Sequence, residues 1–161
     1  MMRRWIVVNA LCCAAALVAC GGDDESPPAG AEGRTKAEWA DEVNATCREG
    51  NAEARRIVGQ VRKEKLSPVA FAAESLERSA PATRRILERQ RAIEAPPSLR
   101  SDFSRYISDL EDAVTLIAQF AEAIRSQRED RVRAFQRRFK RVAAETRPFA
   151  IEHGLTDCLN K

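Results

Sequence analysis

The sequence predicts an all-α fold, an antiparallel four-helix bundle, preceded by a cleaved signal peptide and a flexible tether. Three observations predict this fold. Apolar residues recur at helical spacing between residues 35 and 158, capping residues stand where these patterns begin, and short segments rich in proline, glycine or polar residues separate the patterns. Because amphipathic helices joined by short connections pack as antiparallel neighbours, the bundle is the expected architecture.

The first helix begins at a capping box, in which the Thr35 hydroxyl and the Glu38 carboxylate satisfy free N–H groups of the first turn. Gly50 and Gly59 each cost about 1 kcal/mol relative to alanine within a helix, so we expect close packing against a neighbour at both positions. The apolar face of this helix carries Trp39, Val43, Cys47, Ala54, Ile57, Val58 and Val61.

The second helix begins with Ser67 as its N-cap and Pro68 at its first position. Pro81 lies inside this helix, and because proline removes a helical hydrogen bond, a kink or break is expected near Ser79–Ala80. The run Ala95–Ser98, which holds two prolines, ends the helix. Its apolar residues are Val69, Ala73, Leu76, Ala80, Ile86, Leu87 and Ile93.

The third helix has the most regular pattern and is expected to be continuous. Its apolar face consists of Leu99, Phe103, Tyr106, Leu110, Val114, Ile117, Ala121 and Ile124. A fourth helix follows the polar connection at 126–130, is interrupted near its end by Pro148, and closes at Gly154 as a left-handed residue. Its apolar residues are Val132, Phe135, Phe139, Val142, Ala143, Phe149 and Ala150.

The N-terminus has the features of an export signal. Met1–Arg4 is positively charged, and Trp5–Ala16 is apolar but shorter than the roughly 20 residues that span a bilayer. The stretch Leu17-Val18-Ala19-Cys20 that follows resembles the lipobox of bacterial lipoprotein precursors. The resemblance implies cleavage before Cys20 and attachment of a diacylglyceryl group to its thiol.

Two alternatives to this export route remain open. An ordinary secretory signal would be cut after Ala16, and Arg3-Arg4 resembles half of a twin-arginine signal. With the lipobox, residues 1–19 are the signal peptide, residues 20–34 are a tether that carries lipidated Cys20, and residues 35–161 are the bundle domain. The tether lacks large apolar residues from 21 to 33, so it cannot bury enough surface to order itself, and its reach is about 20 Å.

Cys20, Cys47 and Cys158 remain after removal of the signal. If Cys20 is acylated, the other two form a pair in an oxidising compartment, where a disulfide is favoured. In an antiparallel bundle the chain after the last helix can reach back to Cys47. The segments Asn44–Asn51 and Gly154–Cys158 also resemble small uncharacterised secreted helical proteins of actinobacteria, which bridge an early cysteine to one after the last helix. That resemblance implies the bundle and the bridge, and no activity.

The charge of the processed chain favours neither nucleic acid nor an acidic partner. Removal of Arg3 and Arg4 leaves 25 of the 27 basic residues against 24 acidic ones. The acidic side chains are dispersed among arginines as on a solvated surface, so no paired-carboxylate site is expected. His153, the only histidine, stands beside the helix-ending Gly154, where a structural role is expected. No metal and no cofactor is predicted, and the sequon at Asn44-Ala45-Thr46 is interpreted as chance.

The fourth helix is locally basic, and two interpretations stay open. Its cations could form a solvated face with Phe135 and Phe139 in the core, or the helix could contact anionic lipid. Binding to nucleic acid is the weakest alternative. The cations are Arg131, Arg133, Arg137, Arg138, Lys140 and Arg141.

The expected function is therefore limited. The sequence predicts a lipoprotein anchored on the extracytoplasmic face of the cell membrane, which acts by binding or spacing and is not an enzyme. Its partners are the membrane, through the lipid anchor, and an envelope protein as a further candidate. The alternative is a small-ligand or envelope-stress sensing domain with a pocket that opens in the bundle near Pro81. A cavity that holds Tyr106 together with arginine and carboxylate groups would favour this alternative.

Overall fold

The computed structural model describes residues 34–159, which form one compact unit. The predicted signal peptide, the predicted lipidation site Cys20 and the predicted tether up to residue 33 lie outside the described residues. Within 34–159 every regular element is a helix, so the domain is all-α as predicted. The unit has its own hydrophobic core and an internal disulfide, and it therefore contains the contacts that its folding requires.

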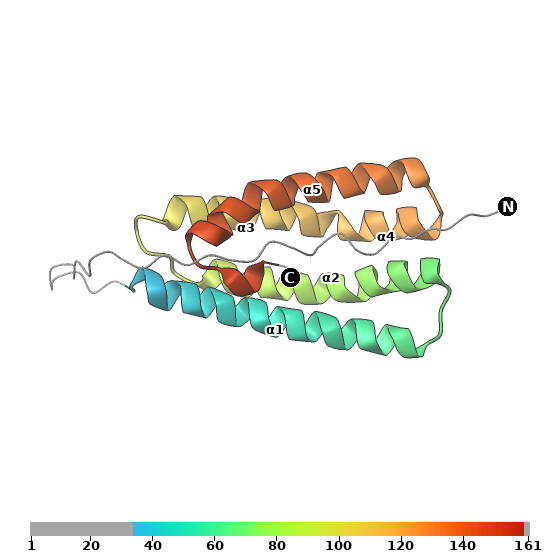
Figure 1. Ribbon diagram of the computed structural model, residues 1–161, viewed down its shortest axis with the longest axis horizontal. Coiled ribbons are helices and arrows are strands. Elements are labelled where there is room, and N and C mark those ends of the chain that lie inside the picture. The colour runs from blue at the N-terminus through green and yellow to red at the C-terminus, as the bar shows by residue number, and fades with distance from the viewer. Residues whose placement is uncertain (1–33, 160–161) are drawn as a thin grey trace, which may run out of the picture. The chain divides into compact units, whose positions relative to one another are not determined.

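α1, α2, the α3 and α4 pair, and α5 extend along the length of the domain, and each runs opposite to the one before it (Figure 1). α1 packs against α2, α2 packs against α3 and α4, and α5 packs against α3 and α4. α3 and α4 lie end to end as one interrupted rod (Figure 1). The elements are α1 (Lys36–Lys63), α2 (Pro68–Ala92), α3 (Arg100–Thr115), α4 (Ile117–Arg125), α5 (Glu129–Glu152) and the short 3₁₀ helix η1 (Thr156–Cys158).

The predicted helix starts are confirmed. The Glu38 N–H donates to the Thr35 hydroxyl at 3.3 Å, and the Glu38 carboxylate accepts the Thr35 N–H at 2.9 Å, which completes the capping box of α1. Ser67 caps α2 by accepting the Ala70 N–H at 3.3 Å. These side chains satisfy donors that would otherwise lack partners within the first turn.

The third predicted helix is not continuous, because the hydrogen-bond pattern changes at Leu116. The Thr115 hydroxyl donates to the Asp112 carbonyl at 2.7 Å, and that carbonyl is the α-helical acceptor for the Leu116 N–H. The Leu116 N–H instead reaches the Ala113 carbonyl at 3.1 Å. α3 therefore ends at Thr115, and α4 begins at Ile117.

The interruption predicted at Pro148 is wrong, because α5 runs from Glu129 to Glu152 through this residue. Of the kink or break predicted in the second helix, the break is also wrong, because α2 runs from Pro68 to Ala92 through Pro81. In this turn the Thr83 hydroxyl donates to the Ser79 carbonyl at 3.0 Å. Neighbouring helices hold α2 along its length, and their packing outweighs the one hydrogen bond that proline removes.

One of the two α1 glycines is explained by close packing. A Cβ on Gly50 would lie 3.0 Å from Cγ1 of Ile86, which confirms the expected contact between α1 and α2. The same expectation is wrong for Gly59, where a Cβ would meet no neighbouring atom within 4 Å.

The core is centred on Trp39 at the start of α1. Its ring meets Phe103 of α3 edge to face, with centroids 5.0 Å apart, and it also contacts Phe149 of α5. Gly154 closes α5 in the left-handed conformation, with φ of 67°, as predicted. The next residue, Leu155, is fully buried in the same core and donates its N–H to the Ala150 carbonyl at 2.8 Å.

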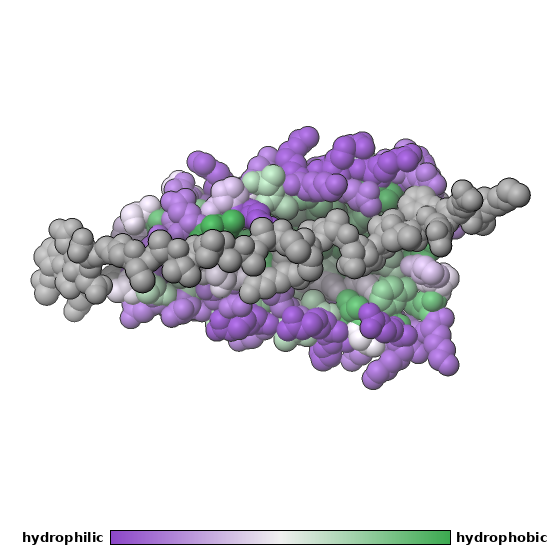
Figure 2. Space-filling model, viewed as in Figure 1, coloured by the Kyte–Doolittle hydropathy of each residue, from purple (hydrophilic) through white to green (hydrophobic). Residues whose placement is uncertain are grey.

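The surface is polar along the outer edges of the domain. Figure 2 shows hydrophilic side chains along the edge formed by α5 and along the opposite edge formed by α1. Within residues 34–159, no helix is long and apolar enough to cross a membrane.

Candidate functional site

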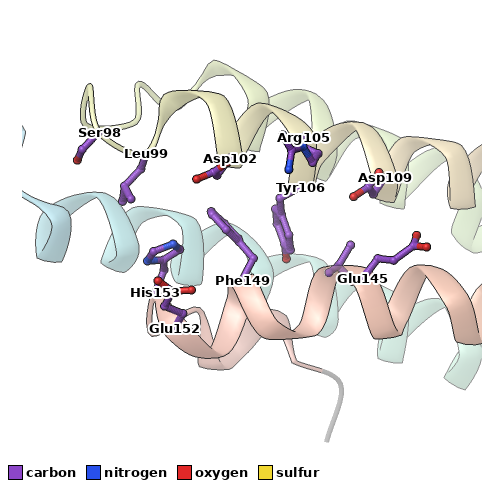
Figure 3. A pocket seen from close by; sticks show the side chains of 11 residues that line it. Ser98, Leu99, Asp102, Arg105, Tyr106, Asp109, Glu145, Phe149, Glu152 and His153 are labelled. Atoms are coloured by element: carbon purple, nitrogen blue, oxygen red, sulfur yellow. The ribbon is translucent and has the colours of Figure 1, made fainter.

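A cleft of about 450 Å³ lies between α3 and α5 (Figure 3). It lies beside the aromatic core and away from Pro81, which does not line it. The described residues that line it are Ser98, Leu99, Asp102, Arg105, Tyr106, Asp109, Glu145, Thr146, Phe149, Glu152 and His153.

Carboxylates lie in two pairs along the cleft, Asp102 with Glu152 toward one end and Asp109 with Glu145 toward the other. Asp102 and Asp109 stand on α3 about two turns apart, roughly 10 Å along the helix, and Glu145 and Glu152 have the same spacing on α5. Because α3 and α5 run in opposite directions, Asp109 lies opposite Glu145, while Asp102 lies at the end that holds Glu152 (Figure 3).

None of these four lining carboxylates forms an ion pair with a described lysine, arginine or histidine. Arg105 is the one arginine or lysine among the described lining residues. The cleft therefore carries an excess of negative charge that the surrounding side chains leave unneutralised.

The centre of the cleft is aromatic. Tyr106 of α3 and Phe149 of α5 lie with ring centroids 5.0 Å apart. Burial raises the pKa of Tyr106 to about 12, so its hydroxyl stays protonated at neutral pH. No hydrogen bond joins this hydroxyl to another described residue, and Figure 3 shows the ring projecting from α3 into the space in front of α5. An aromatic surface thus separates the two carboxylate pairs.

His153 lies at one end of this aromatic surface and packs against it. Its ring packs against Phe149 with centroids 4.4 Å apart and against Trp39 at 6.2 Å. The side chain is 8% exposed, and its buried Nδ1 has no hydrogen-bond partner. Burial lowers the pKa of His153, and the nearby positive charge of Lys36 lowers that pKa further. The imidazole is therefore neutral at pH 7 and packs as part of the core, in line with its predicted structural role.

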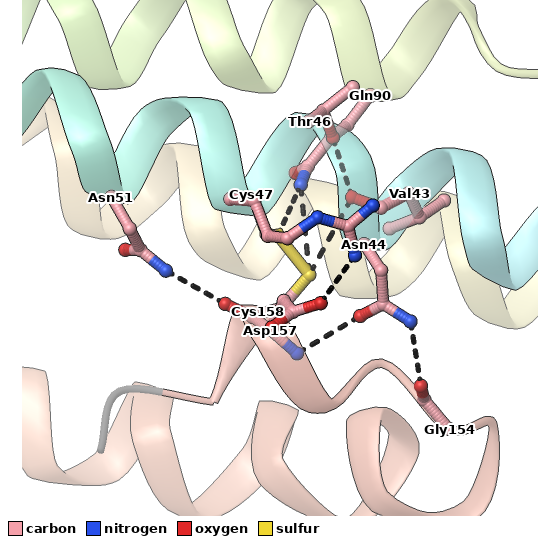
Figure 4. Close-up of polar contacts among 10 residues, drawn as sticks. Val43, Asn44, Thr46, Cys47, Asn51, Gln90, Gly154, Asp157 and Cys158 are labelled. Atoms are coloured by element: carbon pink, nitrogen blue, oxygen red, sulfur yellow. Dashed lines mark hydrogen bonds and ion pairs between the residues drawn. A yellow bond between two sulfur atoms is a disulfide. The ribbon is translucent and has the colours of Figure 1, made fainter.

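A second polar cluster joins α1 to the end of the chain (Figure 4). Cys47 and Cys158 form the predicted disulfide, with Cα atoms 5.1 Å apart. The Asn44 amide donates to the Gly154 carbonyl at 2.9 Å, and the Asn51 amide donates to the Asp157 carbonyl at 2.8 Å. The segments Asn44–Asn51 and Gly154–Cys158 therefore pack against each other as one structural unit.

Gln90 of α2 covers the disulfide from the other side. Its amide donates to Cys47 Sγ at 2.9 Å, while its buried Oε1 has no partner. Asn44 is itself 7% exposed and uses both ends of its amide in hydrogen bonds, so the sequon at 44–46 is inaccessible in the folded domain. This cluster ties α1 and α2 to the end of the chain.

Sequence reasoning did not find the cleft, because it interpreted the acidic residues as dispersed. The available signal was the equal spacing of Asp102 with Asp109 and of Glu145 with Glu152. That spacing has meaning only once α3 and α5 are known to be antiparallel neighbours in a register that aligns the two rows. Tyr106 belongs to the apolar face predicted for the third helix and is buried beside the cleft, as is His153.

Among residues 34–159, no group of three or more His, Cys, Asp or Glu side chains is placed to hold a metal ion. Comparison of the chain with protein-family models, with curated proteins and with solved structures gives no significant match. The geometry of the cleft is therefore the basis for assigning a function.

Proposed function

We propose that this protein is a membrane-tethered, extracytoplasmic binding module that holds an elongated organic cation in the cleft between α3 and α5. The observation that carries the proposal is the placement of two carboxylate pairs, without ion-pair partners among the described residues, on either side of an aromatic surface. This is the ligand-binding alternative raised by the sequence, located at a different place from the one expected.

The spacing of the carboxylates favours a particular shape of ligand. Positive groups about 10 Å apart could each meet one carboxylate pair, while the linker between them would cover Tyr106 and Phe149. Ammonium groups near the rings would gain further cation–π attraction. The Tyr106 hydroxyl, which lacks a partner among the described residues, can accept a hydrogen bond from the same ligand.

Binding is favoured over catalysis by the chemistry of the lining side chains. The Thr146 hydroxyl already donates to the Val142 carbonyl at 2.8 Å, and His153 packs edge to face against aromatic rings. No described hydrogen bond joins His153 to a serine or threonine hydroxyl, which a nucleophile activated by histidine would need.

The scaffold for this site is proposed to be an antiparallel four-helix bundle, in which α3 and α4 together form the third member. The alternating directions in Figure 1 support this arrangement, as does the packing of α2 and α5 on either side of the α3 and α4 rod. Such a bundle presents a rigid surface on which two helices can hold charges at a constant spacing.

Calorimetric titration of residues 34–161 with octamethylenediamine tests the ligand class. We expect binding of this diamine, weaker binding of octylamine and of the shorter putrescine, and no binding of the neutral octamethylene glycol. The double variant Asp109→Asn, Glu145→Gln removes one carboxylate pair and should weaken diamine binding about tenfold, since each partly exposed ion pair contributes up to about 1 kcal/mol.

The matched control is Glu88→Gln, Asp112→Asn, which removes two exposed carboxylates that have no described ion-pair partner and lie outside the cleft. It should leave diamine affinity unchanged. Equal loss of affinity in this control would show that only net charge matters. Absence of diamine binding, or equal binding of the neutral glycol, would refute the proposed site.

The membrane tether has a separate test. Because Leu17-Val18-Ala19-Cys20 has lipobox character, the membrane fraction should yield a peptide that begins at Cys20 and carries a diacylglyceryl group. Mass spectrometry of the exported protein measures this directly. A product that begins at Leu17, or at Cys20 without lipid, would contradict the anchor and leave the cleft proposal unaffected.

A further inference from the structure

The outward face of α5 carries a row of cations that we name the basic stripe: Arg137, Lys140, Arg141 and Arg147. All four of these side chains are exposed, and their steps of three, one and six residues keep them on the side of the helix away from α3 and α4. Figure 2 shows mainly hydrophilic side chains along the corresponding edge of the domain.

The basic stripe has no carboxylate partners among the described residues, in contrast to a row of arginines on α2. Arg85 pairs with Glu53 at 2.8 Å, Arg89 with Glu49 at 2.6 Å, and Arg91 with Glu111. No ion pair to a described residue involves any member of the basic stripe. The stripe therefore retains its full charge for an external partner.

The phenylalanines of α5 do not belong to this surface. Phe135 and Phe139 turn inward and meet Phe120 of α4, with ring centroids 5.7 and 5.4 Å away. The apolar residue that does face outward is Ile151, which is 57% exposed, the largest exposure among the large hydrophobic residues of the described chain. It stands one turn beyond Arg147, at the end of the stripe.

We propose that the basic stripe binds the anionic headgroup surface of a lipid bilayer, with Ile151 entering the interface at one end. Charge complementarity favours this partner, because a row of cations without carboxylate partners along a convex helix matches a plane of lipid phosphates. An exposed isoleucine beside the cations adds the apolar contact that interfacial helices use. This contact is independent of the ligand cleft, whose carboxylates lie on the side of α5 that faces α3.

Vesicle co-sedimentation of residues 34–161 tests the inference without the apolar N-terminal residues, which would partition by themselves. We expect binding to vesicles of phosphatidylglycerol and phosphatidylcholine, little binding to phosphatidylcholine alone, and release by salt. The triple variant R137Q, K140Q, R141Q should weaken binding about a hundredfold, at roughly fivefold for each basic residue. Ile151→Ser should weaken binding further.

The matched control is R85Q, R89Q, R91Q, which makes the same change in net charge with arginines that are ion-paired in the structure. It should bind anionic vesicles nearly as well as the unmodified domain, and circular dichroism checks that all variants fold. Equal losses in the two triple variants would overturn the proposal. So would failure of the unmodified domain to bind, or equal affinity for double-stranded DNA at the same phosphate concentration.

Discussion

The side-chain oxygen of Asn44 accepts a hydrogen bond from the backbone N–H of Asp157 at 3.0 Å, across 113 residues of sequence. The amide nitrogen of the same side chain donates to the Gly154 carbonyl. One residue of α1 thereby satisfies one backbone group in the turn after α5 and one in η1, which would otherwise be left unpaired beside the core.

Replacement of Asn44 should therefore be costly. We expect Asn44→Ala to lower the free energy of unfolding by about 2–3 kcal/mol, because two hydrogen bonds are lost and buried backbone groups remain unpaired. Asn51→Ala is the comparison, since Asn51 makes a single bond to the Asp157 carbonyl and should cost about 1 kcal/mol. Urea unfolding followed by Trp39 fluorescence measures both. Equal losses would show that the second Asn44 bond contributes nothing.

Loss of the disulfide should destabilise the domain more than either substitution. Cys47 and Cys158 are separated by 111 residues, and loop-entropy models assign about 4–5 kcal/mol to closure of a loop of this length. We expect the double variant Cys47→Ala, Cys158→Ala to lose stability of this order. Reduction of the unmodified domain should give the same result, and unchanged unfolding midpoints after reduction would contradict the prediction.

The two glycines of α1 should respond oppositely to alanine. Gly59→Ala adds a methyl group to open space and replaces a poor helix former, so it should stabilise the domain by about 0.5–1 kcal/mol. Gly50→Ala places a Cβ 3.0 Å from Ile86, which must shift, so the gain should be smaller or reversed. Thermal unfolding compares the pair directly. A Gly50→Ala variant stabilised as much as Gly59→Ala would show that the α1 and α2 contact is loose.

His153 should make stability depend on pH below neutrality. Burial lowers its pKa in the folded state, so the unfolded chain binds more protons below the ordinary histidine pKa of about 6.5. The stabilising effect of a neutral His153 is complete above that pH and is lost as the pH falls toward the lowered folded value, by up to about 1.4 kcal/mol per pH unit.

The variant His153→Phe isolates this contribution. It retains an aromatic ring against Trp39 and Phe149 and removes the buried Nδ1 that has no partner. We expect similar stability at pH 8 and a variant that becomes progressively more stable than the unmodified domain as the pH falls below 6.5. Chemical unfolding at several pH values measures the difference. Parallel pH profiles for the two proteins would rule out this effect of His153.

The sequence by itself determined the helical class, the caps and the cysteine pairing. Thr35 with Glu38, Ser67 before Pro68, and Gly154 after α5 are local signals, since each acts on backbone groups within a few residues. The disulfide between Cys47 and Cys158 could also be predicted from the sequence, because only these two cysteines remain if the signal is removed and Cys20 carries lipid.

The outcomes that sequence reasoning predicted wrongly depend on neighbours. Pro81 does not break α2 because helices on both sides hold it, while the third predicted helix ends at Thr115 and resumes at Ile117. The cleft arises only when α3 and α5 align Asp109 with Glu145 in space. Hydrophobic periodicity predicts which face of a helix is buried, but it does not predict how far one helix is shifted along its neighbour. That shift is set by side-chain packing between elements distant in sequence, so only the tertiary structure decided where the charges of this domain meet.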